Sequence, residues 1–218
     1  MTEATLLISS KNYSSWSLRG WLIMRLSGLP FHEETASPDD PVARAELLLQ
    51  SSSIRLPMLI HGEISIWDTL AIAEYLNELR PDARMLPEEP KARALCRAIS
   101  GEMHSGFSAL RNSLPMNLHA HRPGFKLWSA ARSDIDRILE IWEECLNEWG
   151  GPFLFGARPS VADAMYAPVV TRLQTYDVAV GGRSAGYCRT ILAWPEMVEW
   201  VAAAQEEPQE ITELELDF

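Results

Sequence analysis

The sequence lacks a closely spaced cysteine pair, a long apolar run and a basic leader. Its three cysteines, Cys96, Cys145 and Cys188, are far apart, so neither a C-x-x-C redox pair nor a zinc ribbon is indicated. There is no run of about 18 apolar residues, and we therefore expect no membrane-spanning helix. Residues 1–10 have neither a basic region nor a cleavage pattern, from which we expect no secretory signal and a cytoplasmic location.

Basic residues are also scarce, with 19 Lys and Arg against 30 Asp and Glu and a formal net charge of −11. Proteins bind phosphate backbones through Lys and Arg, so this balance predicts no nucleic-acid partner. The negative charge is concentrated at the C-terminus, where eight acidic residues and no basic residue follow Arg189. We expect a solvated C-terminal helix and tail there.

The first 80 residues combine strand and helix patterns. The apolar run 5–9 predicts a buried strand, and apolar residues spaced by three and four over 16–26, followed by Gly28, predict a helix. The pattern continues with a strand over 30–34, a helix from 40 or 41 to about 50, a hairpin of strands 56–60 and 63–66, and a helix over 68–79. The order βαβαββα predicts parallel pairing of the first two strands and an antiparallel hairpin at the edge.

After a linker at 81–87, only helical patterns follow. Apolar residues recur at three and four residues from Ala92 to Leu110, and further helices are predicted over 134–149, from Ser160, and from Pro195. Ser160 and Asp163 form a capping box, which we interpret as the structural start of a core helix. We therefore expect an α+β N-terminal domain of residues 1–80 and an all-α C-terminal domain of residues 88–218.

Four patterns resemble those of the glutathione transferase family and come in the same order. They are Ser14-Ser15-Trp16-Ser17-Leu18-Arg19, Leu56-Pro57, the helix start Asp68-Thr69-Leu70-Ala71-Ile72-Ala73-Glu74-Tyr75-Leu76, and Ser160-Val161-Ala162-Asp163. The first is most similar to the zeta-class motif S-S-C-S-x-R, with Trp16 in place of the cysteine. The zeta substrate-binding arginine corresponds to Thr175 here, and Arg172 lies one turn away. The resemblance implies a thioredoxin-like first domain, glutathione as co-substrate, and a homodimer.

The serine motif implies how the glutathione thiol is activated. A free thiol has a pKa of about 8.5, so only a small fraction is ionised at neutral pH. The resemblance places Ser14 and Ser15 where the first helix begins, and implies that one of them donates a hydrogen bond to the sulfur. The alternative role for either serine is that of an ordinary helix N-cap. We expect one serine in each role, and the sequence does not say which.

The resemblance also implies a binding site for the peptide part of glutathione. Leu56 would pair through its backbone with the cysteinyl part, because Pro57 would be preceded by a cis peptide bond. Asp68 and Thr69 would bind the γ-glutamyl end at the start of a helix, and Arg55 would meet the glycyl carboxylate. The alternatives are an edge-strand proline, ordinary N-cap residues and a surface arginine.

The second substrate, a small hydrophobic electrophile, is expected to bind between the two domains. The candidate pocket residues are Tyr13, Trp16, Met103, His104, Phe107 and Arg111. Met103, Phe107 and Arg111 are spaced by four residues and would share one face of a helix, although Met103 and Phe107 fit a core equally well. His119 and His121 have no third ligand close by, so no metal site is expected.

The sequence thus predicts a glutathione transferase that activates the thiol for conjugation, isomerisation or peroxide reduction, as in detoxification. The alternative is a non-catalytic module of the same fold that binds partners, because fold alone does not determine function. The serines, Pro57 and Asp68-Thr69 favour the enzyme. A redox protein of the thioredoxin type is disfavoured, since it would need the absent cysteine pair.

Overall fold

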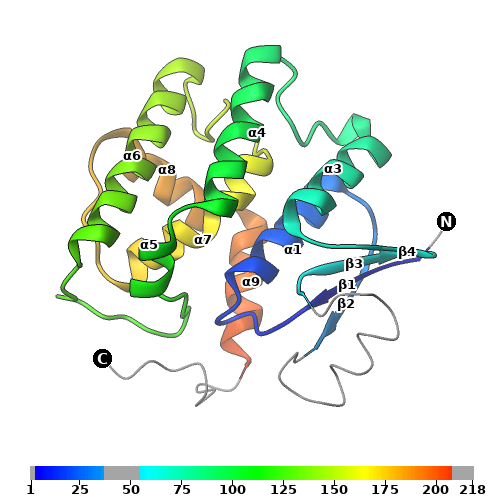
Figure 1. The fold of residues 1–218 in the computed structure, drawn as a ribbon, viewed down its shortest axis with the longest axis horizontal. Coiled ribbons are helices and arrows are strands. Elements are labelled where there is room, and N and C mark those ends of the chain that lie inside the picture. The colour runs from blue at the N-terminus through cyan, green and yellow to red at the C-terminus, as the bar shows by residue number, and fades with distance from the viewer. Residues whose placement is uncertain (1–2, 37–54, 208–218) are drawn as a thin grey trace.

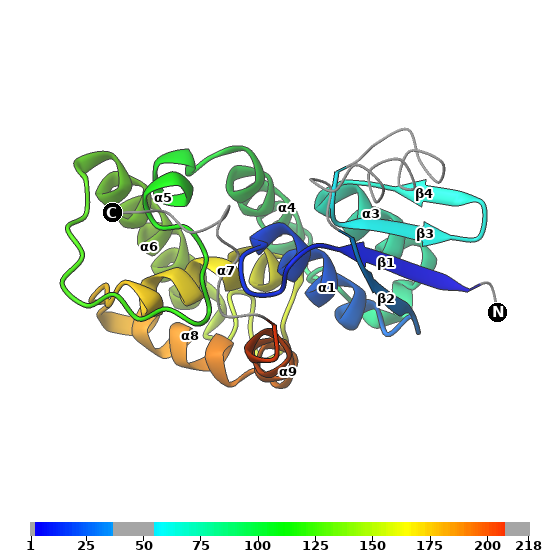
Figure 2. The same cartoon turned by 90° about the horizontal axis from the view of Figure 1, so that it is seen from below.

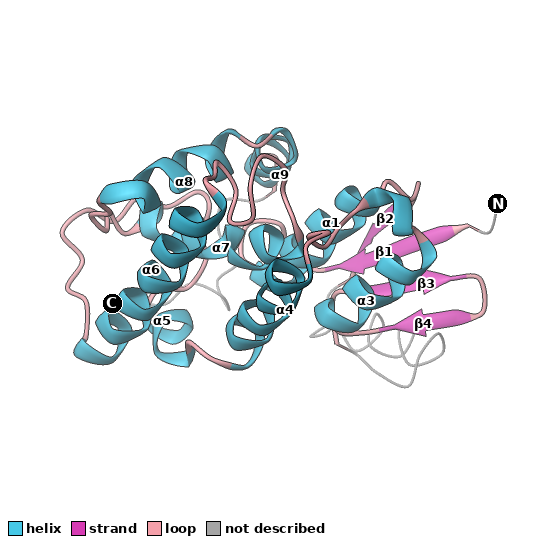
Figure 3. Cartoon of the chain, turned by 90° about the horizontal axis from the view of Figure 1, so that it is seen from above, coloured by secondary structure: helices cyan, strands magenta, loops and turns pink. Residues whose placement is uncertain are grey.

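The computed structural model describes residues 3–36 and 55–207 of the chain. A small mixed sheet stands at one end of the molecule and a group of helices at the other (Figures 1 and 3). The helix expected from about 40 to 50 lies outside the described residues. Within the described ranges, no helix is long and apolar enough to cross a membrane.

The sheet has four strands in the order β2-β1-β3-β4. The strands are β1 (Ala4–Ile8), β2 (His32–Thr35), β3 (Met58–His61) and β4 (Ile64–Ile66). β1 pairs with β2 in parallel, and β3 pairs antiparallel with both β1 and β4. The predicted parallel pair and edge hairpin are therefore confirmed. The tight turn of the hairpin contains Gly62 with φ of 63°, a conformation that glycine adopts without steric cost.

Two helices belong to the sheet half, and both have the termini that their sequences predict. α1 (Ser15–Ser27) ends at Gly28, whose φ of 63° lies in the left-handed region. α3 (Thr69–Leu79) starts at Asp68, whose side chain accepts a hydrogen bond from the Leu70 N–H. The two helices pack on each other, and apolar side chains of β1, α1 and α3 join one core, including Leu6, Ile8, Leu18, Leu22, Ile72 and Leu76.

The second half is helical, as predicted. After a short 3₁₀ turn at Pro81–Ala83 it contains α4 (Pro90–Ser105), α5 (Ser108–Ser113), α6 (Ser129–Trp149), α7 (Val161–Thr175), α8 (Gly182–Ala193) and α9 (Pro195–Gln205). α7 is the central helix, because it is buried along almost its whole length and contacts α1, α4 and α8 (Figure 2). Its position makes it the link between the helical half and the sheet half.

The capping box at the start of α7 has the predicted structural role. The Ser160 backbone N–H and hydroxyl both donate to Asp163 Oδ2 at 2.8 Å, and the Leu154 N–H donates to Oδ1 at 3.0 Å. Asp163 is fully buried, and burial raises the pKa of its carboxyl above the usual value. The box therefore fixes the start of the central helix inside the core.

One predicted helix is broken into two. The pattern from Ala92 to Leu110 predicted a continuous helix, but α4 ends at Ser105 and Phe107 has a left-handed φ of 55°. Gly106 allows the break, because a Cβ atom there would lie 2.7 Å from the Glu102 carbonyl oxygen. The prediction that Met103, Phe107 and Arg111 share one helical face is therefore wrong. α6 also begins before the predicted residue 134, and neither α5 nor α8 was predicted.

Candidate active site

The two serines at the start of α1 lie in different surroundings. Ser14 is the N-cap: its Oγ accepts from the Ser17 N–H at 3.2 Å and donates to Ser17 Oγ at 2.9 Å. Ser15 is buried with 8% exposure, and its Oγ accepts a hydrogen bond from Arg172 Nη2 at 3.2 Å. Within the described part of the chain, no acceptor takes the hydroxyl proton of Ser15. Ser14 therefore holds the helix terminus, and Ser15 keeps a free donor.

The loop before α1 is fixed by Glu207, just beyond α9. Its carboxylate accepts from Ser10 Oγ at 2.7 Å and from the backbone N–H groups of Lys11 and Asn12 at 2.7 and 3.0 Å. Trp200 Nε1 donates to the Lys11 carbonyl oxygen at 3.0 Å. The prediction that the acidic C-terminal residues are only solvated is therefore wrong for Glu207, which satisfies two backbone donors of the loop.

Asn12 ties the same loop to the helical half, and sequence reasoning missed it. Its Oδ1 accepts from the Leu118 and His119 N–H groups at 2.6 and 3.2 Å, and its side chain is fully buried. His119 Nε2 in turn lies 2.7 Å from the Ala204 carbonyl oxygen. This histidine therefore joins a loop to α9, a structural use of a residue that the sequence had raised as a metal candidate.

The Leu56–Pro57 bond is cis, as predicted. Pro57 is buried against α1, where a Cβ atom built on Gly20 would lie 2.5 Å from its Cγ. Leu56 is half-buried and precedes the part of β3 that pairs with β1, so its backbone lies outside that ladder. Arg55 is exposed just before it. The segment thus has the bent, partly open edge that the peptide-binding prediction requires.

Asp68 and Thr69 begin α3, where the prediction placed the γ-glutamyl end. Asp68 Oδ1 accepts from the Leu70 N–H at 3.1 Å, which is the N-cap role, and Oδ2 lies 2.8 Å from His104 Nε2 on α4. The Thr69 hydroxyl is buried, and among the described residues it has no hydrogen-bond partner. A polar group that is buried without a partner costs free energy, so the Thr69 hydroxyl is available to bond to a ligand group.

Three of the predicted pocket residues come together around one indole ring. The His104 ring packs edge-on to Trp16 with centroids 5.2 Å apart, and the Arg111 guanidinium lies 5.5 Å from the Trp16 ring centre. Tyr13 lies in the loop just before α1. Met103 is fully buried and Phe107 is 8% exposed, so both take the core role that the sequence had offered as their alternative.

Two buried arginines complete the surroundings of Ser15. Arg19 donates from Nε to the Met165 carbonyl oxygen at 2.7 Å and from Nη1 to the Ser15 carbonyl oxygen at 3.3 Å. Burial lowers the pKa of both arginines, that of Arg172 to about 10, and the charge of Arg111 lowers both further. The sequence offered one signal for Arg19, a charged residue among the apolar residues of α1.

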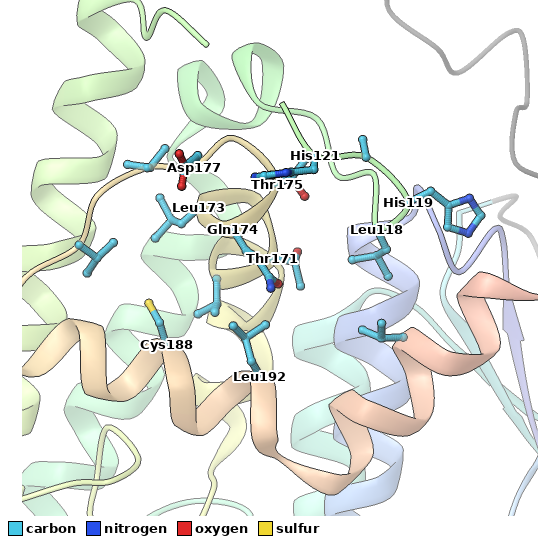
Figure 4. A pocket seen from close by; sticks show the side chains of 15 residues that line it. Leu118, His119, His121, Thr171, Leu173, Gln174, Thr175, Asp177, Cys188 and Leu192 are labelled. Carbon is cyan, nitrogen blue, oxygen red and sulfur yellow. The ribbon is translucent and has the colours of Figure 1, made fainter. Parts of the chain in front are cut away.

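The cysteines do not provide a competing thiol. Burial raises the pKa of Cys96 and of Cys145 to about 12, and that of Cys188 to about 11. Since the thiolate is the reactive form, all three are weak nucleophiles at neutral pH. Cys188 lines a groove of about 680 Å³ beside α7 and α8 (Figure 4). None of the predicted substrate-contacting residues lines this groove, which is therefore separate from the Ser15 site.

Comparisons with known proteins match both halves of the chain. The model described as "Glutathione S-transferase, N-terminal domain" matches residues 13–79, and "Glutathione S-transferase, C-terminal domain" matches residues 118–203. Maleylacetoacetate isomerase of Rattus norvegicus is 33% identical over 57% of this chain and 56% of its own length. A probable maleylacetoacetate isomerase of Vibrio cholerae is 27% identical over 62% and 64%. The chain thus spans between about half and two thirds of the length of these relatives.

Solved structures match over nearly the whole chain. A glutathione transferase homologue from Burkholderia BGR1, solved with bound glutathione, has a TM-score of 0.70 at 23% identity and covers 95% of this chain and 100% of its own. Maleylacetoacetate isomerase from Anaeromyxobacter dehalogenans has a TM-score of 0.68 at 21% identity over 100% and 98%. These likenesses establish the thioredoxin-like fold with its helical second half. The two domain matches, over residues 13–79 and 118–203, place the chain in the glutathione S-transferase family.

Proposed function

We propose that this protein is an enzyme that binds glutathione and ionises its thiol for reaction with a second, small substrate. The observation that carries the proposal is the Ser15 hydroxyl at the first residue of α1, which accepts from Arg172 and has its own proton available. The names of the relatives support a glutathione-dependent isomerisation or transfer as the reaction class. The bound glutathione of the Burkholderia homologue supports the same ligand.

The start of α1 supplies the chemistry for ionising a thiol. The unpaired N–H groups of a helix N-terminus carry partial positive charge, which stabilises an anion placed there. The Ser15 hydroxyl adds a charge-assisted hydrogen bond. Lowering a thiol pKa by about two units requires roughly 2.7 kcal/mol of preferential stabilisation of the thiolate. A hydrogen bond to a charged group contributes about 1.5–3 kcal/mol, so the serine and the helix together suffice.

The remaining predicted residues hold the rest of glutathione. The backbone of Leu56, which lies outside the β1–β3 ladder, pairs with the cysteinyl part as a short additional strand would. The first turn of α3 receives the γ-glutamyl carboxylate, and the Thr69 hydroxyl, which has no hydrogen-bond partner among the described residues, donates to it. In this proposal Arg55, which is exposed just before Leu56, meets the glycyl carboxylate. Asp68 then pairs with the γ-glutamyl ammonium while it remains bonded to His104.

The second substrate contacts Trp16, His104 and Arg111 in this proposal. The Trp16 indole has three polar neighbours, the His104 imidazole and the guanidinium groups of Arg111 and Arg19, which suits a small electrophile that is not purely hydrocarbon. A two-domain division at residues 81–87, a homodimer, and a cytoplasmic role in detoxification remain predictions. The competing function is a glutathione-transferase-like module without turnover.

Single alanine variants of the two serines test the proposal. Ser15→Ala should lower turnover of a reactive aryl halide about 10- to 100-fold while retention on immobilised glutathione persists, because one bond to the thiolate is lost. Ser14→Ala should instead destabilise the protein by about 1 kcal/mol, the usual cost of losing an N-cap. If the wild type is retained but turns over no electrophile, the binding module is the correct function. If Ser15→Ala keeps full turnover, serine activation is wrong.

A further inference from the structure

The Arg172 side chain is held so that one of its N–H groups must point at Ser15. Its Nε donates to the Leu114 carbonyl oxygen at 2.8 Å, and its Nη1 donates to the Pro168 carbonyl oxygen at 3.0 Å. These two acceptors fix the plane of the guanidinium, whose donors form a rigid fork. The Nη2 group then reaches Ser15 Oγ at 3.2 Å. Because that bond occupies a lone pair of the hydroxyl, the hydroxyl proton is directed elsewhere.

Three arginines gather around Ser15 and Trp16, and the described part of the chain gives them no matching negative charge. Arg19 and Arg172 are 0% and 4% exposed, and Arg111 lies over the Trp16 ring. Among residues 3–36 and 55–207, no carboxylate forms a hydrogen bond or ion pair with any of these three arginines, and the buried Arg19 Nη2 has no partner at all. Unpaired buried cations are costly, so the site gains free energy when an anion enters.

We propose that Arg172, on the central helix of the helical half, is a positioning residue for thiol activation that orients the Ser15 hydroxyl and places a positive charge beside the sulfur. The inference rests on the function proposed above. A sulfur within hydrogen-bonding reach of Ser15 Oγ lies roughly 6 Å or less from the Arg172 guanidinium. At such separations an opposite charge lowers the pKa of an acid by about one to three units.

The other charged and titratable groups near the cluster do not replace Arg172. Arg19 directs its Nη1 to the Ser15 carbonyl oxygen rather than to the hydroxyl. Arg111 lies over Trp16, and Asp68 is bonded to His104, so the negative charge of Asp68 is directed toward α4. Tyr166 and Tyr176 are the other titratable neighbours, and burial raises the pKa of Tyr166, so it stays neutral when the thiol ionises. Within residues 3–36 and 55–207, Arg172 is the one residue that bonds to the Ser15 hydroxyl.

Titration of the bound thiol tests this role without relying on turnover. The full-length protein is saturated with glutathione, and the ultraviolet absorbance of the thiolate is followed against pH for three variants. Arg172→Met removes both the charge and the planar set of N–H donors. Arg172→Lys keeps the charge but loses the planar donors. Arg132→Met, which removes an exposed charge from α6, is the matched control. Glutathione retention and thermal unfolding show which variants are folded and loaded.

We expect Arg172→Met to raise the pKa of the bound thiol by about one unit or more, which shifts the acid limb of the turnover profile by the same amount. Arg172→Lys should raise this pKa less, and Arg132→Met should not change it. Below the thiol pKa, the methionine variant should turn over about tenfold more slowly than the wild type, since one pKa unit is a tenfold change in thiolate. The KM for the electrophile should stay unchanged.

An unchanged thiol pKa in a folded, glutathione-loaded Arg172→Met protein would overturn the inference while the proposed function stands. If the KM for an anionic electrophile also rises in that protein, Arg172 is instead a contact of the second substrate. If the methionine variant does not fold, Arg172→Gln, which also removes the charge, replaces it, and a wild-type thiol pKa in that protein is the refuting result. A wild-type protein that does not lower the thiol pKa would instead refute the proposed function.

Discussion

Replacing Gly20 with alanine should destabilise the protein, against the usual trend for a helix interior. Alanine normally stabilises such a position by about 1 kcal/mol relative to glycine. At Gly20 the added Cβ would lie 2.5 Å from Pro57 Cγ and 2.8 Å from Pro57 Cβ. Both atoms belong to a rigid ring, so α1 or the segment before β3 must move. Inserting a methyl group into a packed core costs about 1–3 kcal/mol, which equals or exceeds the helix gain.

Gly101→Ala is the matched control, because Gly101 is also in a helix interior and a Cβ there meets no atom within 4 Å. The difference between the two variants removes the helix-propensity contribution and should be about 1–3 kcal/mol. For a chain of this size that is roughly 2–12 °C in melting temperature, measurable by calorimetry or urea denaturation. Gly20→Ala should also weaken retention on immobilised glutathione. Equal stabilisation by both substitutions would refute the packing argument.

Two further substitutions test contacts that hold the site in place. Glu207→Gln should speed hydrogen exchange of the Lys11 and Asn12 amides, because the Glu207 carboxylate accepts from both. It should also lower the free energy of unfolding by about 1–3 kcal/mol. Glu206→Gln, at an exposed position, is the control and should have neither effect. Burial raises the pKa of Asp163, so its contribution to stability is greatest below the unfolded pKa of about 3.9 and falls as pH rises through the folded value. Asp163→Asn should abolish that fall when the free energies of unfolding are compared from pH 4 upward, and an identical pH dependence in the variant would contradict the assignment.

Local signals in the sequence were enough to predict most element boundaries in the sheet half. Gly28 marks the end of α1, and Asp68 marks the start of α3, because caps are made by residues next to the helix they end or begin. The capping box at Ser160 worked for the same reason. The break at Gly106 was missed because the apolar spacing continues through it, and a single glycine in a helical pattern is usually tolerated.

In the candidate site, too, the residues with local contacts were predicted and those with distant contacts were not. Ser14 and Ser15 were placed correctly at the start of α1 because the motif and the helix signal are adjacent in the chain. The roles of Arg172 and Glu207 were not predictable, since their partners lie 157 and 197 residues away. Nothing in periodicity or composition indicates that an arginine of a central helix turns toward a particular serine. Only the packing of α7 on α1 brings the two together.

These distant contacts make the N-terminal end of α1, where we propose that the thiol is activated, dependent on the helical half. Along the loop into α1, Lys11 accepts from Trp200, Asn12 accepts from the loop after α5, and Ser15 accepts from Arg172. Each of these partners belongs to a different segment of the second half. The position of Ser15 therefore depends on a contact from the helical half, whereas Ser14 bonds to Ser17 within α1. If the proposed function holds, a substitution in the helical half changes thiol ionisation without touching glutathione, because it moves the residues that hold Ser15.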